Sequence, residues 1–306
     1  MSKIKEIGGY FERDLGNGDS PLPNGILFNS GRNALRHIVR VLGIRRIHVP
    51  YYTCPVVWDA LKAEGCEIIF YEIDSQFYPK KKFAKKDFII YTNYFGCCGS
   101  IVDEFAADYS NLIVDCAQAY YARHKGRVSF SSPRKFFGVP DGGVAYGVRL
   151  IYDNVYEIDD SSQRCAHLKL RAEGRVAEGY KAFQIAERTL ENAPIRLMSN
   201  KTKEMLSKLN LRAASIIRKQ NFNYLRNMLG DTFPFSLTDD DVPMVFPYVT
   251  DNVNLRQRLI DNKIYVAKYW PGISPSCKYQ DRLLAVPIDQ RYGISDMHRI
   301  CEVING

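Results

Sequence analysis

The fold is decided by the stretch HVPYYTCPVVWDALKAEGCEIIFYEID, residues 48–74, which holds a turn, a helix and a strand in succession. A short β-type run over 46–50 leads into it and ends at a proline. The apolar residues of 55–65 recur at helical spacing, and Gly65 closes that predicted helix. The apolar run over 66–74 predicts the next strand. A strand, a helix and a strand in this order predict a parallel strand pair with the helix packed against it.

The same alternation continues through the following residues. We expect strands over 87–96 and 111–122, the second running into a loop, a helix over 100–109 between them, and a strand pair over 142–153. Continuous apolar strands separated by helices are typical of a parallel sheet that is covered on both faces, so the predicted fold class is α/β. Ligands of such sheets bind beyond the carboxyl ends of the strands, where Asp115 is expected.

The second half of the chain changes in character. Long amphipathic stretches rich in Ala, Lys, Glu and Arg predict helices over 163–192 and 200–230. The remainder alternates short strands and helices, as in a small α+β domain. We therefore predict a large α/β domain over 1–160, linking helices over 161–230 and a smaller C-terminal α+β domain over 231–306.

Composition narrows the class of protein. The 306 residues are 46% hydrophobic and 25% charged, as in ordinary soluble proteins, and no uncharged apolar run reaches the roughly 18 residues that a membrane span needs. Residues 1–15 carry charges throughout and lack the apolar core of a secretory signal. The eight cysteines have no metal-binding spacing, so we expect reduced thiols, no metal site and a cytoplasmic protein. Even the adjacent Cys97 and Cys98 are not expected to form a disulfide.

The formal net charge of +8 is compatible with a nucleic acid, a membrane surface or a phosphate-bearing substrate as partner. Much of this charge lies in PKKKFAKKD, residues 79–87, which has no aromatic platform and no recognised nucleic-acid motif. We interpret this segment as a solvated loop, and we expect neither nucleic acid nor a membrane as partner.

Three short motifs point to chemistry, and the first is FNSGRNALRHIVRVLG, residues 28–43. A polar turn of Ser30, Gly31 and Arg32 opens an amphipathic helix, whose free N–H groups and dipole favour an anion such as phosphate. Ser30 serves equally well as an ordinary helix cap, so this motif alone does not establish a site.

The second motif is LIVDCAQAYY, residues 112–121. A carboxylate at the end of a buried strand is costly unless a cation or a protonated group faces it, and a protonated ring nitrogen would serve Asp115. Gln118 follows in the loop that would face the same cleft. The alternative is a loop cap or an internal ion pair.

The third motif is SSPRKFFGVPDGG, residues 131–143. Pro133 bends the chain and the glycine pair frees the backbone, so Lys135 is expected to project from a constrained loop. A lysine desolvated in a cleft has an amine that is available to attack an aldehyde. A solvated surface lysine is the alternative when this motif is taken alone.

Taken together and in this order, the motifs resemble those of the DegT/DnrJ/EryC1/StrS family of sugar aminotransferases. NSGRNAL is similar to the family's S-G-T-x-A-L phosphate turn, IVDCAQAYYA to its E-D-x-A-Q-A motif, and SSPRKFFGVPDGGVAYG to the segment around its Schiff-base lysine. The resemblance extends more loosely over nearly the whole chain. It implies the PLP-dependent transferase fold type I, with pyridoxal 5'-phosphate (PLP) as cofactor and an isologous homodimer as assembly.

The resemblance also implies roles for individual residues. Lys135 would bind the cofactor covalently and, once displaced, carry a proton between substrate and cofactor carbons. Asp115 would pair with the ring nitrogen, Gln118 would lie by the ring hydroxyl, and the turn over 30–32 would receive the phosphate. Arg32 stands where the family usually has threonine, and its cation could itself meet the phosphate.

The chain departs from the family pattern at several positions around the cofactor. Cys54 stands where many members place an aromatic ring over the cofactor, so we expect another aromatic residue, such as Tyr52 or Tyr94, in that role. Phe130 replaces the usual serine five residues before the lysine, and we expect Ser131 to substitute for it.

The resulting hypothesis is an aminotransferase that moves an amino group, from glutamate, to a nucleotide-linked keto sugar for polysaccharide or glycan biosynthesis. Two alternatives stay open. Related sugar dehydratases replace the lysine by histidine, and Lys135 argues against that chemistry. The second alternative is a degenerate family member that binds a ligand or partner without turnover. The departures from the family pattern are compatible with it, because, of the Asn-x-Arg motif that contacts the phosphate from a neighbouring subunit, only the arginine, Arg196, is present here. The sugar and the carbon that is aminated cannot be predicted, because specificity lies in loops.

Overall fold

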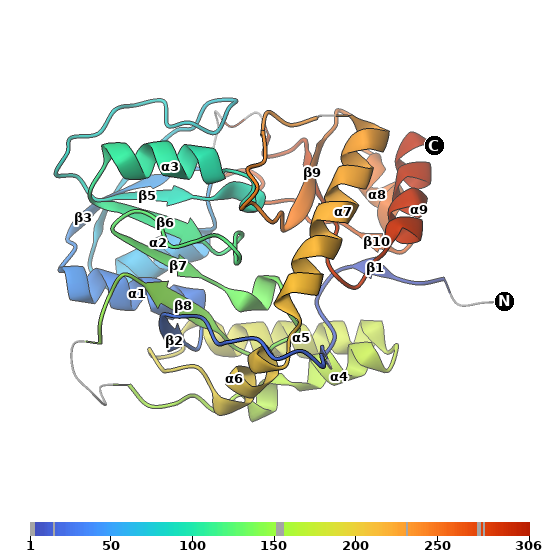
Figure 1. Ribbon diagram of the computed structural model, residues 1–306, viewed down its shortest axis with the longest axis horizontal. Coiled ribbons are helices and arrows are strands. Elements are labelled where there is room, and N and C mark those ends of the chain that lie inside the picture. Colours follow the sequence, from blue (N-terminus) through green and yellow to red (C-terminus); the bar gives the residue numbers. More distant parts are fainter. Residues whose placement is uncertain (1–3, 15, 151–155, 231, 274–276, 278) are drawn as a thin grey trace.

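A twisted sheet forms the larger part of the protein in the computed structural model, which describes residues 4–14, 16–150, 156–230, 232–273, 277 and 279–306 (Figure 1). Within these residues the sheet has seven strands in the order β2-β8-β7-β6-β5-β3-β4. The pairs β3·β4, β3·β5, β5·β6 and β6·β7 are parallel, whereas β8 runs antiparallel to both β7 and β2. The strands are β2 (Ile26–Phe28), β3 (Arg46–Pro50), β4 (Glu67–Tyr71), β5 (Ile89–Thr92), β6 (Leu112–Cys116), β7 (Val128–Ser131) and β8 (Gly143–Tyr146).

Helices cover both faces of this sheet. Successive residues of a strand point to opposite faces, so each strand contributes apolar side chains to both helical layers. Ile90, Ile113 and Phe130 pack with α1 (Gly31–Leu42) and α2 (Pro55–Ala63) in one core cluster. The alternate residues Ile89 and Tyr91 belong to a second cluster on the face that α3 (Gly99–Asp108) covers. Two short 3-10 helices, η1 (Tyr94–Gly96) and η2 (Pro133–Lys135), follow β5 and β7. The mostly parallel sheet between helical layers agrees with the predicted α/β class.

The remaining chain forms helices below the sheet and a smaller α/β unit beside it (Figure 1). In the smaller unit, β9 pairs antiparallel with β11, and β1, from the start of the chain, pairs in parallel with β10. The domain boundaries stay a prediction. The elements are β1 (Ile7–Gly8), η3 (Ser162–Arg164), α4 (Ala166–Ala172), α5 (Val176–Glu191), α6 (Asn200–Ser207), α7 (Leu211–Leu229), β9 (Val245–Val249), α8 (Leu255–Asp261), β10 (Ile264–Tyr265), β11 (Leu283–Pro287) and α9 (Ile294–Asn305).

Three expected elements differ from the structure. The single helix expected over 163–192 is divided into α4 and α5 at Gly174, whose φ of 75° is a left-handed conformation that ends a helix. The helix expected over 200–230 is divided into α6 and α7, because the Asn210 side chain accepts from the Ala213 N–H and starts a new helix. Of the strand pair expected over 142–153, β8 is present, and residues 151–153 lie outside the described residues.

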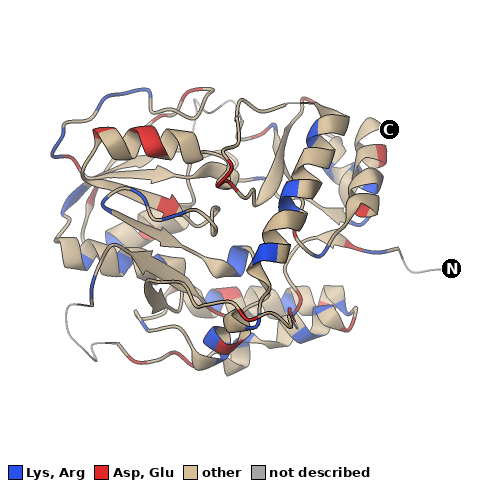
Figure 2. Cartoon of the chain, in the orientation of Figure 1, with Lys and Arg blue, Asp and Glu red and all other residues tan. Residues whose placement is uncertain are grey.

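Basic and acidic side chains are interspersed over the helices, and Figure 2 also shows basic residues in the loop between β4 and β5. This is the predicted loop 79–87, where Lys80 pairs with Glu72 at 3.1 Å and the Lys85 Nζ donates to the Asp108 carbonyl at 2.6 Å. All eight cysteines are free thiols, as predicted, so Cys97 and Cys98 are not joined. Among the described residues, the helices are too short or too polar to cross a membrane.

Candidate active site

Asp115 lies near the carboxyl end of β6, on the face of the sheet that α1 and α2 cover. Its side chain is buried, and one carboxylate oxygen accepts from the Ala117 N–H at 2.8 Å. Burial raises the pKa of Asp115, whereas the nearby Lys135 ammonium and the Ala117 N–H oppose the shift. The carboxylate is therefore held in a place where a cationic partner stabilises its charged form.

Lys135 ends η2, the short helix that follows β7. Its backbone N–H donates to the Ser132 carbonyl at 3.2 Å. The carbonyl of the next residue, Phe136, accepts from Arg218 at 3.2 Å and from Gln290 at 2.9 Å. Arg218 is fully buried, and its guanidinium lies over the Phe136 ring, 4.6 Å from the ring centre. The lysine thus projects from a loop that is anchored by residues from α7 and from the segment after β11.

The N-terminal turn of α1 is fixed by a close approach of two backbone segments. Ser30 caps the helix, because its hydroxyl accepts from the Asn33 N–H at 3.1 Å. A Cβ at Gly143 would lie 2.2 Å from the Ser30 carbonyl carbon and oxygen, so a side chain there cannot be accommodated without backbone movement. Gly31 is different, because a Cβ there would meet the Ser132 Cβ at an ordinary 3.4 Å. The second glycine of the predicted pair therefore seats the turn beside β8.

These three elements enclose one cavity of about 290 Å³, which we call the lysine cavity. Such a volume is at the lower end of the range for small-molecule sites. The cavity brings together the turn of α1, the end of β6 and the lysine loop, with α2 and the last turns of α5 completing its wall. Its lining residues are Ser30, Gly31, Arg32, Leu35, Cys54, Val56, Val57, Asp115, Ala117, Phe130, Ser132, Arg134, Lys135, Glu187, Leu190 and Glu191.

Five of the eight predicted site residues therefore line one cavity: Ser30, Gly31, Arg32, Asp115 and Lys135. Gln118 is buried but does not line this cavity. Its Oε1 accepts from the Phe95 N–H at 2.8 Å, and its Nε2 has no hydrogen-bond partner among the residues that the structure describes. A buried amide donor without a partner is costly, which is typical of a group that a ligand satisfies.

Tyr52 and Tyr94 lie away from the lysine cavity, in the aromatic core on the α3 face of the sheet. The two rings stack with centres 5.8 Å apart, and Trp270 packs edge-on against Tyr52 at 5.0 Å. Neither ring lines the lysine cavity, in which the aromatic lining residue is Phe130.

Ser131 also faces away from the lysine cavity, because residues of β7 alternate between the two faces. Phe130 packs on the α1 face, so Ser131 points to the opposite face, where its hydroxyl is buried without a hydrogen-bond partner among the described residues. Ser132 lines the cavity instead. The sequence prediction missed Ser132, although the apolar Phe130 in a serine-rich run is the signal that could have set the alternation.

The last turns of α5 were also missed. Glu187, Leu190 and Glu191 recur at helical spacing and face the cavity together. Arg134 forms an ion pair with Glu187, and Arg32 donates to the Leu190 carbonyl. These contacts join segments far apart in the sequence, so no local pattern announces them.

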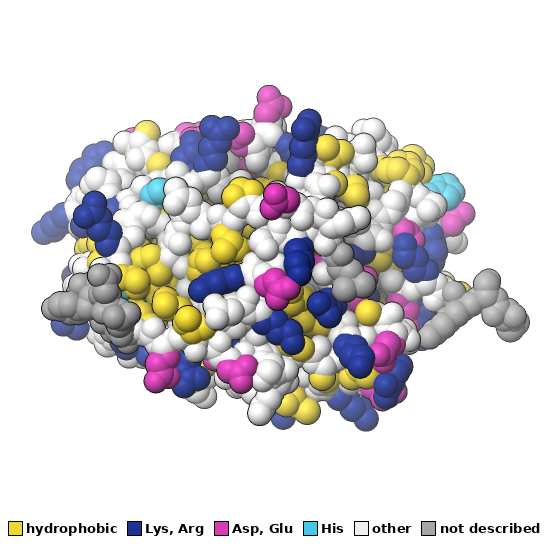
Figure 3. All heavy atoms as spheres, turned by 60° about the horizontal axis from the view of Figure 1, so that its bottom comes forward, with side chains coloured by type: hydrophobic (Ala, Val, Ile, Leu, Met, Phe, Trp, Pro, Cys, Tyr) yellow, Lys and Arg dark blue, Asp and Glu magenta, His cyan; other side chains and the backbone are white. Residues whose placement is uncertain are grey.

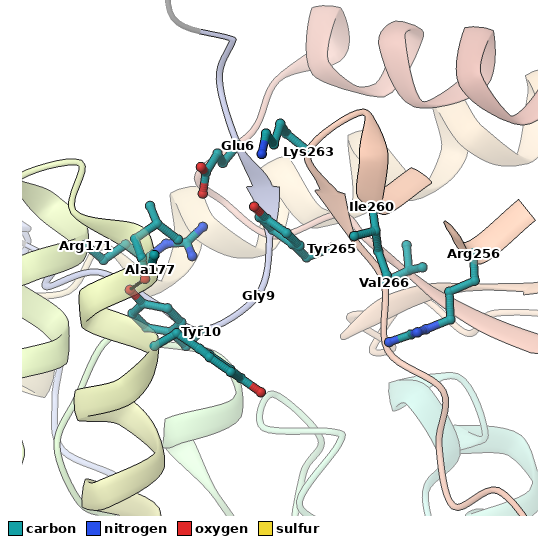
Figure 4. A pocket seen from close by; sticks show the side chains of 12 residues that line it. Glu6, Gly9, Tyr10, Arg171, Ala177, Arg256, Ile260, Lys263, Tyr265 and Val266 are labelled. Atoms are coloured by element: carbon teal, nitrogen blue, oxygen red, sulfur yellow. Dashed lines mark hydrogen bonds between the residues drawn. The ribbon is translucent and has the colours of Figure 1, made fainter. Parts of the chain in front are cut away.

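Lys135 also lines a second cavity of about 430 Å³ between the lysine loop and the smaller unit, which we call the middle cavity. A third, the outer cavity, has about 420 Å³ and shares Gly9, Arg256, Tyr265 and Val266 with the middle one. Figure 4 shows Arg171 and Arg256 reaching the outer cavity from opposite sides. Neighbouring cavities that share lining residues therefore extend from Lys135 to two arginines.

Arg171 is the more deeply buried of these two cations. Its Nε donates to the Glu12 carboxylate at 3.0 Å and one Nη to the Gly8 carbonyl at 2.7 Å, while its other Nη has no partner among the described residues. Tyr10, whose ring lies under this guanidinium, stacks on Phe183 at 5.4 Å and forms an aromatic wall of the outer cavity.

Comparison with solved structures identifies the fold. The sugar aminotransferase CalS13 from Micromonospora echinospora matches with a TM-score of 0.62 and 15% identity over 91% of this chain and 86% of that one. A DegT DnrJ EryC1 StrS aminotransferase from Brucella abortus gives 0.61 and 16% over 93% and 86%. Spr1654 from Streptococcus pneumoniae gives 0.60 and 14% over 95% and 92% in its PLP-form, and it is also known in a PMP-form.

At these identities the likeness establishes the fold. The predicted class, the α/β fold of the PLP-dependent type I transferases, is confirmed. No protein-family model matches the sequence, and no curated protein sequence matches it.

Proposed function

We propose that the protein is a PLP-dependent aminotransferase that moves an amino group from glutamate to a nucleotide-linked keto sugar, for polysaccharide or glycan biosynthesis. The observation that carries the proposal is the meeting of Lys135 and Asp115 in the wall of one cavity beside the N-terminal turn of α1. The fold, shared with sugar aminotransferases, supports it.

The residues present fit this cofactor. The free N–H groups at the start of α1, at Gly31 and Arg32, suit its phosphate. Asp115 suits the ring nitrogen, because a buried carboxylate is stabilised by a protonated partner. Lys135 provides the amine for covalent attachment, and the unpartnered Gln118 amide suits the ring hydroxyl. When bound, PLP supplies an electron-accepting ring that stabilises a substrate carbanion.

The chain's own residues supply orientation and proton transfer. Asp115 keeps the ring nitrogen protonated as long as its carboxylate is ionised. The Nζ of Lys135 would be the base that removes the proton from the donor carbon and the acid that later delivers a proton to the acceptor carbon. Arg218 and Gln290 fix the Phe136 carbonyl, which keeps the preceding lysine directed at the cavity.

The series of cavities supports a substrate with a phosphate-bearing extension. A keto group that reacts at Lys135 leaves the rest of the substrate in the middle cavity, beside Arg256. Arg171 and Lys263 line the outer cavity beyond it, together with the aromatic side chains of Tyr10 and Tyr180. A diphosphate linked to a sugar and a base matches cations that are followed by an aromatic wall.

We also propose a cytoplasmic homodimer, in which a second copy covers the lysine cavity. Figure 3 shows apolar side chains gathered on the face that carries α1, α4 and α5. Tyr180 and Ile185 on α5 are 52% and 63% exposed, on the helix whose last turns line the cavity. Large exposed apolar groups beside a site are typical of an interface. Free thiols at all eight cysteines agree with a reducing compartment.

The test is covalent trapping. The protein is mixed with PLP, reduced with borohydride and analysed by peptide mass, with Lys135→Ala as the variant and Lys169→Ala, an exposed lysine of α4, as the matched control. We expect one adduct, on Lys135, which disappears in the variant alone. Glutamate should then convert bound PLP to its amino form. An adduct without this conversion would favour a degenerate binding protein, and no adduct on Lys135 would refute the proposal.

A further inference from the structure

Two arginines in the wall of the lysine cavity reach the same face of α5. Arg32, in the first turn of α1, donates to the Leu190 carbonyl, and Arg134, next to the candidate lysine, pairs with Glu187. Residues 187 and 190 are three apart, so they lie one helical turn from each other on α5. Both cations therefore lie beside the N-terminal turn of α1.

The two arginines differ in their hydrogen-bond partners and in the donors that are left without one. The Arg32 guanidinium is committed to a backbone carbonyl that cannot leave, and burial lowers its pKa. Arg134 is bound to a carboxylate instead, and its Nε is buried without a hydrogen-bond partner among the residues that the structure describes. Arg134 is therefore the one of the two that combines a buried, unpartnered donor with an exchangeable counter-ion.

Glu187 can release Arg134 at low cost. Its side chain is 37% exposed, so water can solvate the carboxylate once it turns outward, whereas the Arg134 side chain is only 16% exposed and stays in the wall. A phosphate carries close to two negative charges at neutral pH and presents more acceptor oxygens than one carboxylate. A phosphate at the start of α1 thus competes favourably with Glu187 for this guanidinium.

We propose that Arg134 is the side-chain cation that binds the cofactor phosphate, in exchange for Glu187, so that this acid sets the affinity for the cofactor. The inference rests on the proposed function and assigns to Arg134 and Glu187 roles in that site. Arg196 pairs with Asp159 and Glu157 and does not line the lysine cavity of its own chain, so within one chain the lysine loop supplies the cation for the phosphate.

A purely structural tie between η2 and α5 is the competing explanation. If the Arg134–Glu187 pair only braced the lysine loop, breaking it from either side would weaken every ligand of Lys135 alike. Phosphate exchange instead predicts opposite effects from the two sides, and only for a ligand that carries a phosphate. PLP and pyridoxal, which lacks the phosphate, are therefore the two probes.

The experiment measures the Kd of each probe by absorbance titration and by borohydride trapping on Lys135. We expect Arg134→Gln to weaken PLP binding about 10- to 100-fold, as the loss of a charge-assisted hydrogen bond implies. Glu187→Gln should strengthen it about 3- to 10-fold, and should do so no longer when Arg134→Gln is present. Pyridoxal binding should change less than about twofold in all variants.

Glu178→Gln is the matched control, since Glu178 pairs with Arg175 in the first turn of α5 and does not line the lysine cavity. It should leave both affinities unchanged. Unchanged PLP affinity in Arg134→Gln, or weaker PLP binding in Glu187→Gln, would overturn the inference while trapping on Lys135 still supports the proposed function. If Arg134→Gln does not fold, Glu187→Gln decides alone. Trapping of neither probe by the wild-type protein would overturn both proposals.

Discussion

Replacing Gly143 by alanine tests the backbone approach that seats the phosphate turn. The new Cβ would lie 2.2 Å from the Ser30 carbonyl carbon and oxygen and 2.4 Å from the Gly31 nitrogen. All three are backbone atoms, so no side-chain rotation relieves the overlap. Restoring ordinary contact requires β8 and the start of α1 to separate by about 1 Å, in an interior that is close-packed.

The expected cost follows from overpacking, which destabilises by about 1–3 kcal/mol and occasionally more. We expect about 3 kcal/mol here, because the obstacle is backbone, and in a chain of 306 residues this lowers the melting temperature by roughly 5 °C. PLP affinity should also fall, because the N–H groups of the α1 turn move relative to Asp115 and Lys135.

Gly31→Ala is the matched control, because its Cβ meets only the Ser132 Cβ at 3.4 Å and the Ser131 carbonyl at 3.5 Å. Its melting temperature should stay within about 2 °C of wild type, as for other substitutions without a clash. Circular dichroism gives the melting temperatures and absorbance titration gives the PLP affinity. A Gly143→Ala protein that melts with the wild type and binds PLP equally well would refute the close approach of β8 to the turn.

Three further outcomes are expected. Asp115→Asn should still bind PLP on Lys135 but slow the glutamate half-reaction about 100-fold or more, measured in a single turnover, because the ring nitrogen loses its counter-charge. Burial, followed by the Arg134 charge, lowers the pKa of His167 from 6.5 to about 4. Between these two pH values the unfolded chain therefore binds a proton at His167 that the folded chain does not bind. Stability should therefore fall by up to about 3 kcal/mol as pH drops from 6.5 to 4, and His167→Gln should remove that part of the slope in urea unfolding. Arg218→Met should cost about 3 kcal/mol in the same assay because it leaves buried acceptors unpaired, whereas the exposed Arg212→Met should cost less than about 0.5 kcal/mol.

Elements with a strong local pattern were predictable from the sequence. The strand over 46–50 has the predicted bounds, and α1 begins directly after the predicted cap Ser30. The pairing of β1 with β10 was not predictable, since two-residue strands carry no periodicity and their partners lie at opposite ends of the chain. Gly174 and Asn210 are residue types that commonly end or begin helices. The helical periodicity on each side of them nevertheless led to the prediction of continuous helices.

The candidate site divides in the same way. The ends of parallel strands meet at one edge of a sheet, so Asp115 and the lysine loop could be expected together from their order alone. The side chains of a strand alternate between the two faces of the sheet. An error of one residue in this alternation therefore assigns every side chain to the wrong face. Ser131 and Ser132 differ by that one step. The apolar Phe130 was the available signal for the phase, but the prediction followed the motif position instead. Tyr52 does not line the lysine cavity, and the sequence could not indicate this, because a turn residue has no periodicity from which to read its face.

The charge of the lysine cavity is the reason to expect that its affinity for the proposed cofactor depends on α5. Among the described lining residues, Arg32, Arg134 and Lys135 face three acids, which are Asp115, Glu187 and Glu191. A balanced set of charges exerts little net attraction on a phosphate, so attraction must come from the N–H groups of the α1 turn and from a cation that gives up its acid. Asp115 is buried and, in the proposed site, would face the ring nitrogen, whereas the two glutamates border on solvent. The acids of α5 are therefore the part of the wall whose charge can be withdrawn, and their replacement by amides should change cofactor affinity without altering the chemistry at Lys135.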